Sequence, residues 1–181
     1  DVSTALGWQG PGEVCALHDA PVEQLAADAV AGGNPVIPLV GVLRERVSGD
    51  SRVWVHRGAT SQDVLDSALM LLAHRSASLT VSQLRTAAAS LETFAAEHRD
   101  AVAAARTLTQ HAVPTTIGLR AAGWLRGVRR ATEHLERATA ALPAQLAGAG
   151  GTRTSHVEGA ASGAAGELPV AIAADAGLVS P

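Results

Sequence analysis

The stretch SQDVLDSALMLLAHRSASLTVSQLRTAAASLETFAAE, residues 61–97, decides the fold. Apolar residues recur along it at steps of three and four, the spacing of one face of a helix. They are Val64, Leu65, Ala68, Leu69, Leu72, Leu79, Leu84, Ala88, Leu91 and Ala95. Neither proline nor glycine interrupts the stretch, so we predict one continuous helix from about Ser61 to about Glu97. At 1.5 Å per residue this helix would be roughly 55 Å long.

Helical patterns continue on both sides of this stretch. Upstream, Val22–Ala31 has helical spacing and stops at two glycines and a proline, and another helix begins at or near Pro38. Downstream, a helix is predicted over about 116–142, and residues 156–178 form a less regular run rich in alanine and glycine. The chain therefore reads as a succession of helices.

Composition also favours an all-α fold. The chain has 181 residues, of which 47% are hydrophobic and 2% aromatic, and its many alanines and leucines lose little freedom in a helix. Helices as long as the predicted one exceed what a compact globule of this size needs. We therefore predict a bundle of long helices whose core is completed by oligomerisation.

Charge and cysteine content limit the classes of partner. The net charge of -3 gives no reason to expect nucleic-acid binding, and the absence of lysine excludes a P-loop lysine or a Schiff-base lysine within this chain. The single Cys15 cannot form an internal disulfide, and no apolar run is long enough to span a membrane. We expect a cytoplasmic protein without membrane contact. The chain opens on Asp1 rather than methionine, so we interpret it as a piece of something longer.

A first polar cluster, HRGATSQD at residues 56–63, precedes the long helix. Thr60 or Ser61 suits a helix N-cap, and Asp63 suits the positive end of the helix dipole. Capping does not explain His56 and Arg57, however. Together with free N–H groups at a helix start, these two side chains would form a pocket for a carboxylate or phosphate.

A second polar cluster, RTLTQHAVPTTIG at residues 106–118, lies between the two longest predicted helices. We expect a loop that presents the polar side chains of Thr109, Gln110 and His111, and histidine is well suited to proton transfer near neutral pH. A hydrogen-bonded loop histidine without a catalytic role is the competing interpretation. Pro114 with Thr115 or Thr116 is an ordinary way to start the next helix.

The remaining histidines suggest no metal site. No pair of them forms a zinc-binding pattern such as His-Glu-x-x-His, so we predict no metal. From the residues alone, the chain is an α-helical and oligomeric protein with two polar clusters that could meet around an anion.

The two clusters, in this order and with long helices between and after them, resemble the fumarase/aspartase superfamily. That superfamily carries a Gly-x-Thr-Ser-x-Asp motif before one core helix, here residues 58–63, and a Thr-x-x-Gln-x-Ala-x-Pro motif before the next, here residues 107–114. The strings GNPVIPLV, WVHRGATSQDVLDSALMLL and RTLTQHAVPTTIGLRAAGWL are most similar to the bacterial 3-carboxy-cis,cis-muconate cycloisomerases. The likeness covers about residues 33–152.

The resemblance implies a homotetramer whose core is a bundle of long helices and whose active sites each take segments from three chains. Residues 1–56 would belong to the N-terminal helical domain and residues 57–181 to part of the central bundle. By this likeness the first motif supplies carboxylate-binding positions and the second a substrate-contacting glutamine. These positions are His56, Thr60, Ser61, Gln62 and Gln110. Arg57 and Thr109, which are argued from the clusters alone, complete the predicted substrate-binding set.

Two departures from the superfamily pattern matter. Many members begin the second motif with Thr-His, whose histidine transfers a proton, whereas this chain has Leu108 there. The cycloisomerases also lack that histidine, which leaves His111 as the nearest candidate catalytic residue. The superfamily's third motif, a Ser-Ser-x-Met-Pro-x-Lys-x-Asn loop bearing the general base, is absent, because the chain has no lysine and its only methionine, Met70, lies in the predicted helix.

The implied activity is lactonisation of the polycarboxylate 3-carboxy-cis,cis-muconate in protocatechuate degradation, without a cofactor and only in the complete protein. Two alternatives stay open. One is adenylosuccinate lyase or another succinate-type carbon–heteroatom lyase of the same superfamily, although Leu108 argues against the former. The other is a helical assembly module without catalysis.

Overall fold

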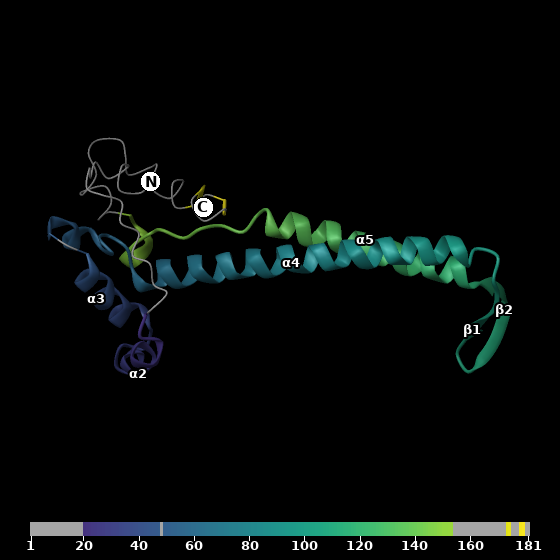
Figure 1. Ribbon diagram of the computed structural model, residues 1–181, viewed down its shortest axis with the longest axis horizontal. Coiled ribbons are helices and arrows are strands. Elements are labelled where there is room, and N and C mark those ends of the chain that lie inside the picture. Colours follow the sequence, from purple (N-terminus) through teal and green to yellow (C-terminus); the bar gives the residue numbers. More distant parts are fainter. Residues whose placement is uncertain (1–19, 48, 154–172, 175–177, 180–181) are drawn as a thin grey trace. The chain divides into compact units, whose positions relative to one another are not determined.

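A computed structural model describes residues 20–47, 49–153, 173–174 and 178–179. The chain forms two units (Figure 1). The first unit contains residues 1–72 and 142–181, and the second contains residues 73–141. The described residues are mostly helical, as the composition predicts.

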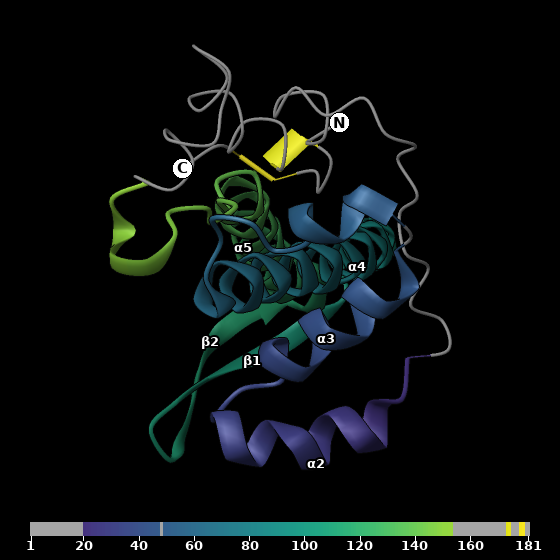
Figure 2. The same cartoon turned by 90° about the vertical axis from the view of Figure 1, so that its left-hand side faces the viewer.

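The first unit begins with two short helices, α2 (Val22–Gly32) and α3 (Val36–Arg46), which pack against each other (Figure 2). Helix α2 stops at Gly33, whose φ of 72° lies in the left-handed region that glycine adopts without strain. The Asn34 side chain then accepts a hydrogen bond from the Val36 backbone N–H at 3.0 Å, at the start of α3. Both helices were predicted, and Pro38 lies in the first turn of α3 as expected.

A 3₁₀ helix, η1 (Gly49–Trp54), leads to the long helix α4, which runs over Ser61–Glu97. These bounds agree with the prediction from the apolar spacing. The part of α4 up to Leu72 belongs to the first unit, where Met70 packs against a small core of buried residues. That core is made by Ala144, Ala173 and Leu178. Most of the predicted third helical run, 156–178, lies outside the described residues.

The second unit consists of the rest of α4, the strands β1 (Val102–Thr107) and β2 (Gln110–Thr116), and the helix α5 (Ile117–Thr139). Within it, α4 and α5 lie side by side and the two strands connect them (Figure 1). Thr116 is the N-cap of α5, and its Oγ1 accepts a hydrogen bond from the Leu119 N–H at 3.1 Å. The predicted start of this helix is thereby confirmed.

The strand pair is a feature that the sequence analysis missed, since it placed a loop in this region. β1 and β2 pair antiparallel, from Val102 opposite Thr116 to Thr107 opposite Gln110, with a bulge near Ala104. A two-residue turn at Leu108 and Thr109 joins them, and Thr109 has a φ of 61°. The second polar cluster therefore lies on a β-hairpin, whose backbone pairing fixes the order of its side chains.

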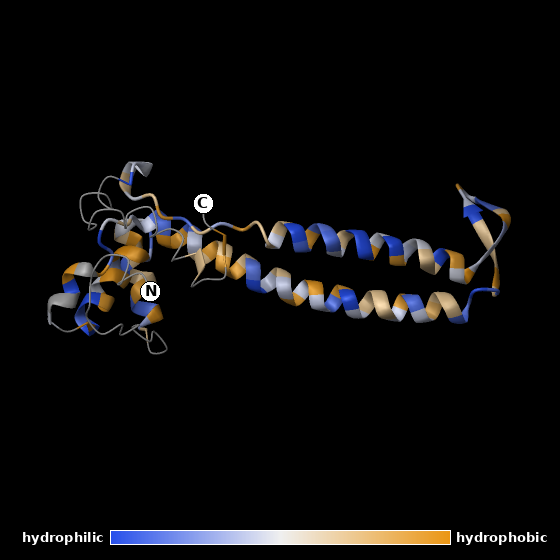
Figure 3. Ribbon diagram, turned by 90° about the horizontal axis from the view of Figure 1, so that it is seen from above, coloured by the Kyte–Doolittle hydropathy of each residue, from blue (hydrophilic) through white to orange (hydrophobic). Residues whose placement is uncertain are grey.

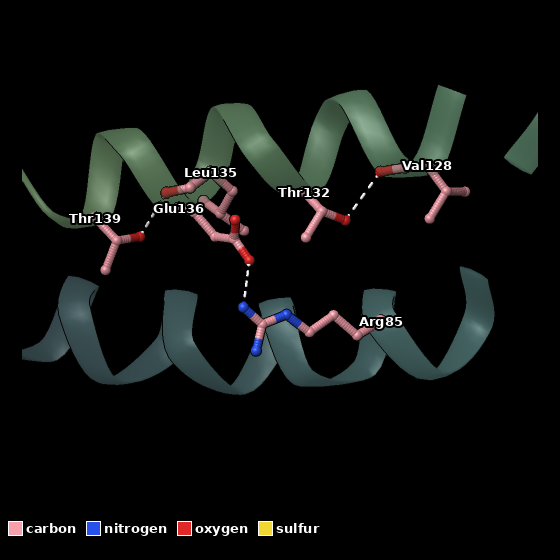
Figure 4. A network of polar contacts seen from close by, with 6 residues as sticks. All are labelled: Arg85, Val128, Thr132, Leu135, Glu136 and Thr139. Carbon is pink, nitrogen blue, oxygen red and sulfur yellow. Dashed lines mark hydrogen bonds and ion pairs between the residues drawn. The ribbon is translucent and has the colours of Figure 1, made fainter. Parts of the chain in front are cut away.

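Polar and backbone contacts hold α5 against α4 within the second unit. Arg85 forms an ion pair with Glu136 at 2.7 Å (Figure 4), and Arg129 forms one with Glu92 at 2.8 Å. Gly118 lies so close to α4 that a Cβ on it would be 2.6 Å from the Ala95 carbonyl oxygen. The helices touch closely at the start of α5 and are bridged by charged side chains further along.

Many apolar side chains of both helices remain exposed in this single chain, and Figure 3 shows apolar positions distributed along them. Large ones in the second unit are Leu79, Phe94, Leu119 and Trp124. Ala121 and Leu125 of α5 are buried, so one side of that helix is already covered. The exposed set is of the kind expected for a bundle that other chains complete.

Candidate active site

The first polar cluster lies at the start of α4 and is organised by Asp63. The Asp63 backbone N–H donates to the Thr60 carbonyl oxygen at 3.1 Å, and the Asp63 carboxylate accepts from the Thr60 N–H at 2.9 Å. The carboxylate contact is one half of a capping box, the half in which the side chain of the third helical residue reaches back to the N-cap N–H. Thr60, one of the two predicted candidates, is therefore the N-cap position, and Asp63 stabilises its backbone.

The Asp63 carboxylate also reaches a distant part of the chain. It accepts hydrogen bonds from the backbone N–H groups of Ala147 at 3.0 Å and Gly148 at 2.9 Å. With only 3% of its surface exposed, Asp63 is a buried acceptor with three backbone donors. The sequence indicates only a helix-dipole role for Asp63, because no local pattern points to partners 84 and 85 residues away.

Ser67, one turn further along α4, holds the same distant segment. Its Oγ donates to the Gln145 carbonyl oxygen at 3.0 Å and accepts from the Gln145 N–H at 2.9 Å. Residues 145–148, which we call the strap, are thus fixed to the first two turns of α4 at two points. Leu146 of the strap is buried.

Beside this start lies a cavity of about 370 Å³. Its wall is mostly apolar and comes from α3, from the start of α4 and from the strap; the α3 residues are Val36, Leu39, Val40 and Leu43. His56, Asp63 and Ser67 are polar members of the lining. The side chains of Asp63 and Ser67 are engaged with backbone groups, which leaves the side chains of His56 and Gln145 as the polar lining groups that could meet a ligand.

His56 lies in a constrained position just before the motif. Its φ is 62°, which is uncommon for a residue with a side chain. Burial lowers the pKa of the His56 imidazole below its usual 6.5, the nearby Arg44 guanidinium lowers it further, and Asp63 partly opposes both. This shift favours the neutral imidazole, which can donate from one ring nitrogen and accept at the other.

The other predicted residues of the first cluster differ in exposure. Thr60 and Ser61 are half-buried, while Arg57 and Gln62 are exposed. The Gln62 amide donates to the Asp66 carboxylate at 2.7 Å, one turn along the helix. The structure brings His56, Thr60 and Ser61 together at one helix start and leaves Gln62 engaged with its own helix.

The second cluster lies in the second unit, on the β1–β2 hairpin. Thr109, Gln110 and His111 are all exposed, and His111 stands opposite Arg106 in the strand pairing. The Thr109 hydroxyl donates to the Leu108 carbonyl oxygen at 2.7 Å. The two clusters belong to different units, before and after the one continuous helix α4.

Within the described part of the chain, no group of three or more histidine, cysteine, aspartate or glutamate side chains could hold a metal ion. Over the same residues, none of the helices combines the length and the apolar character that crossing a membrane requires.

Comparisons with known proteins agree with these motifs. A lyase family model matches residues 18–167. Over 128 residues the chain is 46% identical to a nitrosuccinate lyase of Streptomyces davaonensis, covering 69% of this chain and 27% of that protein. Over 162 residues it is 40% identical to a 3-carboxy-cis,cis-muconate cycloisomerase of Pseudomonas aeruginosa, covering 86% of this chain and 34% of that protein. The chain thus spans about a third or less of the length of these relatives.

Solved structures give the same result. The 3-carboxy-cis,cis-muconate lactonizing enzyme of Pseudomonas putida matches with a TM-score of 0.81 at 29% identity, over 92% of this chain and 38% of that one. A fumarate lyase of Mesorhizobium matches with a TM-score of 0.77 at 28% identity, over 99% of this chain and 39% of that one. With its two motifs, its fold and a family match over most of its length, the chain belongs to the lyase family of the fumarase/aspartase superfamily.

Proposed function

We propose that the complete protein carrying this chain is an enzyme that makes or breaks a bond across a carbon–carbon double bond next to a carboxylate. The observation that carries the proposal is the start of α4. There, Thr60 and Ser61 are half-buried and follow closely after His56, whose pKa is lowered by burial, at a helix end that favours negative charge. A substrate carboxylate is the ligand that such a helix start suits.

The family chemistry proceeds through an intermediate with extra charge on a substrate carboxylate. A base removes a proton from the carbon next to that carboxylate, and the carboxylate oxygens take up the electron pair. The leaving group on the neighbouring carbon then departs as the double bond forms; ring closure onto a double bond follows the reverse order. Donors preorganised around the carboxylate stabilise this charge, and we assign this task to Thr60, Ser61 and His56.

The two candidate substrates are supported by different observations. The 40% identity over 86% of the chain and the exposed Leu108, where other members have a proton-transferring histidine, favour lactonisation of 3-carboxy-cis,cis-muconate. The 46% identity to a nitrosuccinate lyase favours elimination from nitrosuccinate, in which the nitro group leaves as nitrite and fumarate forms. We place the cycloisomerase first and the nitrosuccinate lyase second.

We propose that the active site is completed by other copies of the chain in a homotetramer. The support is the exposed apolar surface of α4 and α5 and the placement of the two clusters in different units. In this arrangement the hairpin of one copy, with Thr109, Gln110 and His111, would face the α4 start of another. His111 is our candidate acid or base, and no metal or cofactor takes part.

The deciding experiment assays the complete purified protein with both substrates. Consumption of 3-carboxy-cis,cis-muconate with lactone formation supports the first proposal, and release of equal amounts of nitrite and fumarate from nitrosuccinate supports the second. Failure with both, together with a helical oligomer of normal stability, would favour the assembly module without catalysis.

The role of His111 is tested by His111→Asn, with His134→Asn of α5 as the matched control at another exposed histidine. General acid–base catalysis contributes about a hundredfold or more, so we expect His111→Asn to lower kcat by that order and the control to leave it unchanged. Turnover of His111→Asn near that of the wild type would dismiss this assignment.

A further inference from the structure

The side chain that carries the inference is the Asp63 carboxylate. An ordinary capping carboxylate accepts N–H groups of its own helix start only. Asp63 accepts one such group, from Thr60, and two more from Ala147 and Gly148 of the strap. Both carboxylate oxygens are used, since Oδ1 takes Ala147 and Oδ2 takes Thr60 and Gly148.

The strap is shaped to deliver these donors. Gly148 has a φ of 72° and is buried, so its N–H faces Asp63 where a residue with a side chain would be strained. Arg153 donates its backbone N–H to the Ala147 carbonyl oxygen at 2.9 Å, which closes a turn between the end of the strap and Arg153. On the other side, Gln145 is held twice by Ser67.

The charge of Asp63 makes this arrangement relevant to a carboxylate ligand. A negative side chain three residues from Thr60 would repel a substrate carboxylate if its charge were unscreened. Three backbone N–H donors surround the Asp63 carboxylate, and 97% of its surface is covered by the protein. The N–H dipoles of the strap therefore partly offset the charge of Asp63 and hold the carboxylate that binds the Thr60 N–H.

We propose that Asp63 is a positioning residue for the carboxylate site, and that the strap of residues 145–148 sets the conformation of the Thr60–Ser61 turn through it. Asp63 does not touch the substrate. Asp63 holds the Thr60 N–H, and the strap holds Asp63. The positions of the Thr60 and Ser61 hydroxyls, which donate to the substrate, therefore depend on a segment 84 residues further along the chain. This inference rests on the proposed function only in taking Thr60 and Ser61 as carboxylate ligands.

The test replaces Asp63 by asparagine in the complete protein, with Asp28→Asn as the matched control. Asparagine has the same shape as aspartate, but an NH₂ group replaces one carboxylate oxygen. That NH₂ group would face a backbone N–H donor. Asp28 accepts a side-chain hydrogen bond from Gln24 at 2.8 Å on the exposed surface of α2, so its replacement removes a charge of the same sign away from the site.

We expect Asp63→Asn to raise KM about tenfold with a smaller change in kcat, because hydrogen bonds to a charged group contribute more than those between neutral groups. Both variants are measured well below their melting temperatures, and Asp28→Asn should match the wild type. A lower melting temperature with unchanged KM would show that Asp63 is merely structural and would overturn the proposal.

Ser67→Ala provides a second variant in case Asp63→Asn does not fold. It removes only the two contacts to Gln145 and leaves Asp63 in place. We expect faster hydrogen exchange at the backbone amides of residues 145–148. We also expect KM to rise a few fold, since the two neutral hydrogen bonds between Ser67 and Gln145 are lost. Faster exchange with unchanged KM would uncouple the strap from the site and contradict the inference.

Fumarate binding by calorimetry separates this inference from the proposed function. If the wild-type protein binds fumarate but turns over neither candidate substrate, the proposed function fails while the inference is still tested by weaker fumarate binding in Asp63→Asn. Equal fumarate affinity in Asp63→Asn and the wild type would overturn the inference alone. A wild-type protein that binds no dicarboxylate would overturn both.

Discussion

The two ends of α4 are held in opposite ways. At its start, the Asp63 side chain reaches outward and gathers three backbone N–H groups from two parts of the chain. At its end, Gly118 offers no side chain, and α5 begins directly against the α4 backbone: the Gly118 N–H donates to the His98 carbonyl oxygen at 3.0 Å and the Ile117 N–H to Ala101 at 2.9 Å. A buried polar side chain holds one end of α4, and a close backbone contact that glycine permits holds the other.

The difference bears on function because each end carries one motif. The motif at the start is ordered by its own unit, with its ligand candidates half-buried. The motif at the end lies on a hairpin whose polar side chains are exposed, although its backbone is anchored at Gly118. A ligand site that is ordered before assembly and a second motif that is exposed until assembly fit the proposed shared active site.

Gly118→Ala should have the largest effect on stability. The added Cβ would lie 2.6 Å from the Ala95 carbonyl oxygen and 2.8 Å from that of His98, and backbone atoms cannot move aside as a flexible side chain can. We expect a loss of about 3 kcal/mol in the free energy of unfolding, at the upper end of overpacking costs. Urea unfolding followed by circular dichroism measures it.

Gly123→Ala is the matched control in the same helix, because nothing lies within 4 Å of the added Cβ. Alanine is the better helix former by about 0.5–1 kcal/mol, so this variant should be slightly more stable than the wild type. If both replacements behave alike, the close approach at Gly118 does not hold the end of α4, and the contrast between its two ends disappears.

Ser61→Ala tests whether the start of α4 is a ligand site as well as a helix start. Thr60 is the N-cap and Ser61 the first helical residue, so a purely structural loss should stay below the roughly 1 kcal/mol that a capping hydroxyl contributes. A site loss should lower kcat/KM by at least about tenfold through a lost charge-assisted hydrogen bond. Thr80→Ala is the control, because the Thr80 hydroxyl donates only to the Ser76 carbonyl oxygen of its own helix. Equal kcat/KM for Ser61→Ala and the wild type would leave Ser61 a structural residue.

How far the sequence could predict this molecule depends on the range of the interactions. The bounds of α4 follow from an uninterrupted apolar period, which is local information, and the N-cap at Thr116 follows from a threonine before an apolar run. The likeness to a known superfamily located both motifs. All of these features could be inferred from residues that are neighbours in the chain.

The hairpin and the strap could not be inferred in that way. Residues 102–106 read VAAAR, and alanine favours helix, so only pairing with β2 makes them a strand. The turn is also unusual, because Thr109 takes a positive φ where glycine or asparagine would have been the signal. The partners of Asp63 lie 84 and 85 residues away, beyond any local pattern.

A moderate effect is expected from acid at His56. Burial and Arg44 keep the folded-state pKa of His56 below 6.5, so the unfolded chain binds this proton more readily than the folded one. Stability contributed by neutral His56 is therefore present above pH 6.5 and is lost as the pH falls below it towards the folded pKa. Melting temperatures between pH 7.5 and 5 should fall less steeply in His56→Gln than in the wild type, and His134→Gln serves as the control. Parallel curves for His56→Gln and the wild type would mean that the α4 start does not bury this imidazole.

The smallest effect is expected from the ion pairs between α4 and α5. The side chains of Arg85 and Glu136 remain 69% and 38% exposed (Figure 4), and solvent screening leaves such a pair about 0–1 kcal/mol. A double-mutant cycle with Arg85→Ala and Glu136→Ala should give a coupling within that range that shrinks with added salt. A coupling as large as the loss in Gly118→Ala would mean that side chains, and not the close backbone contact, hold this unit together.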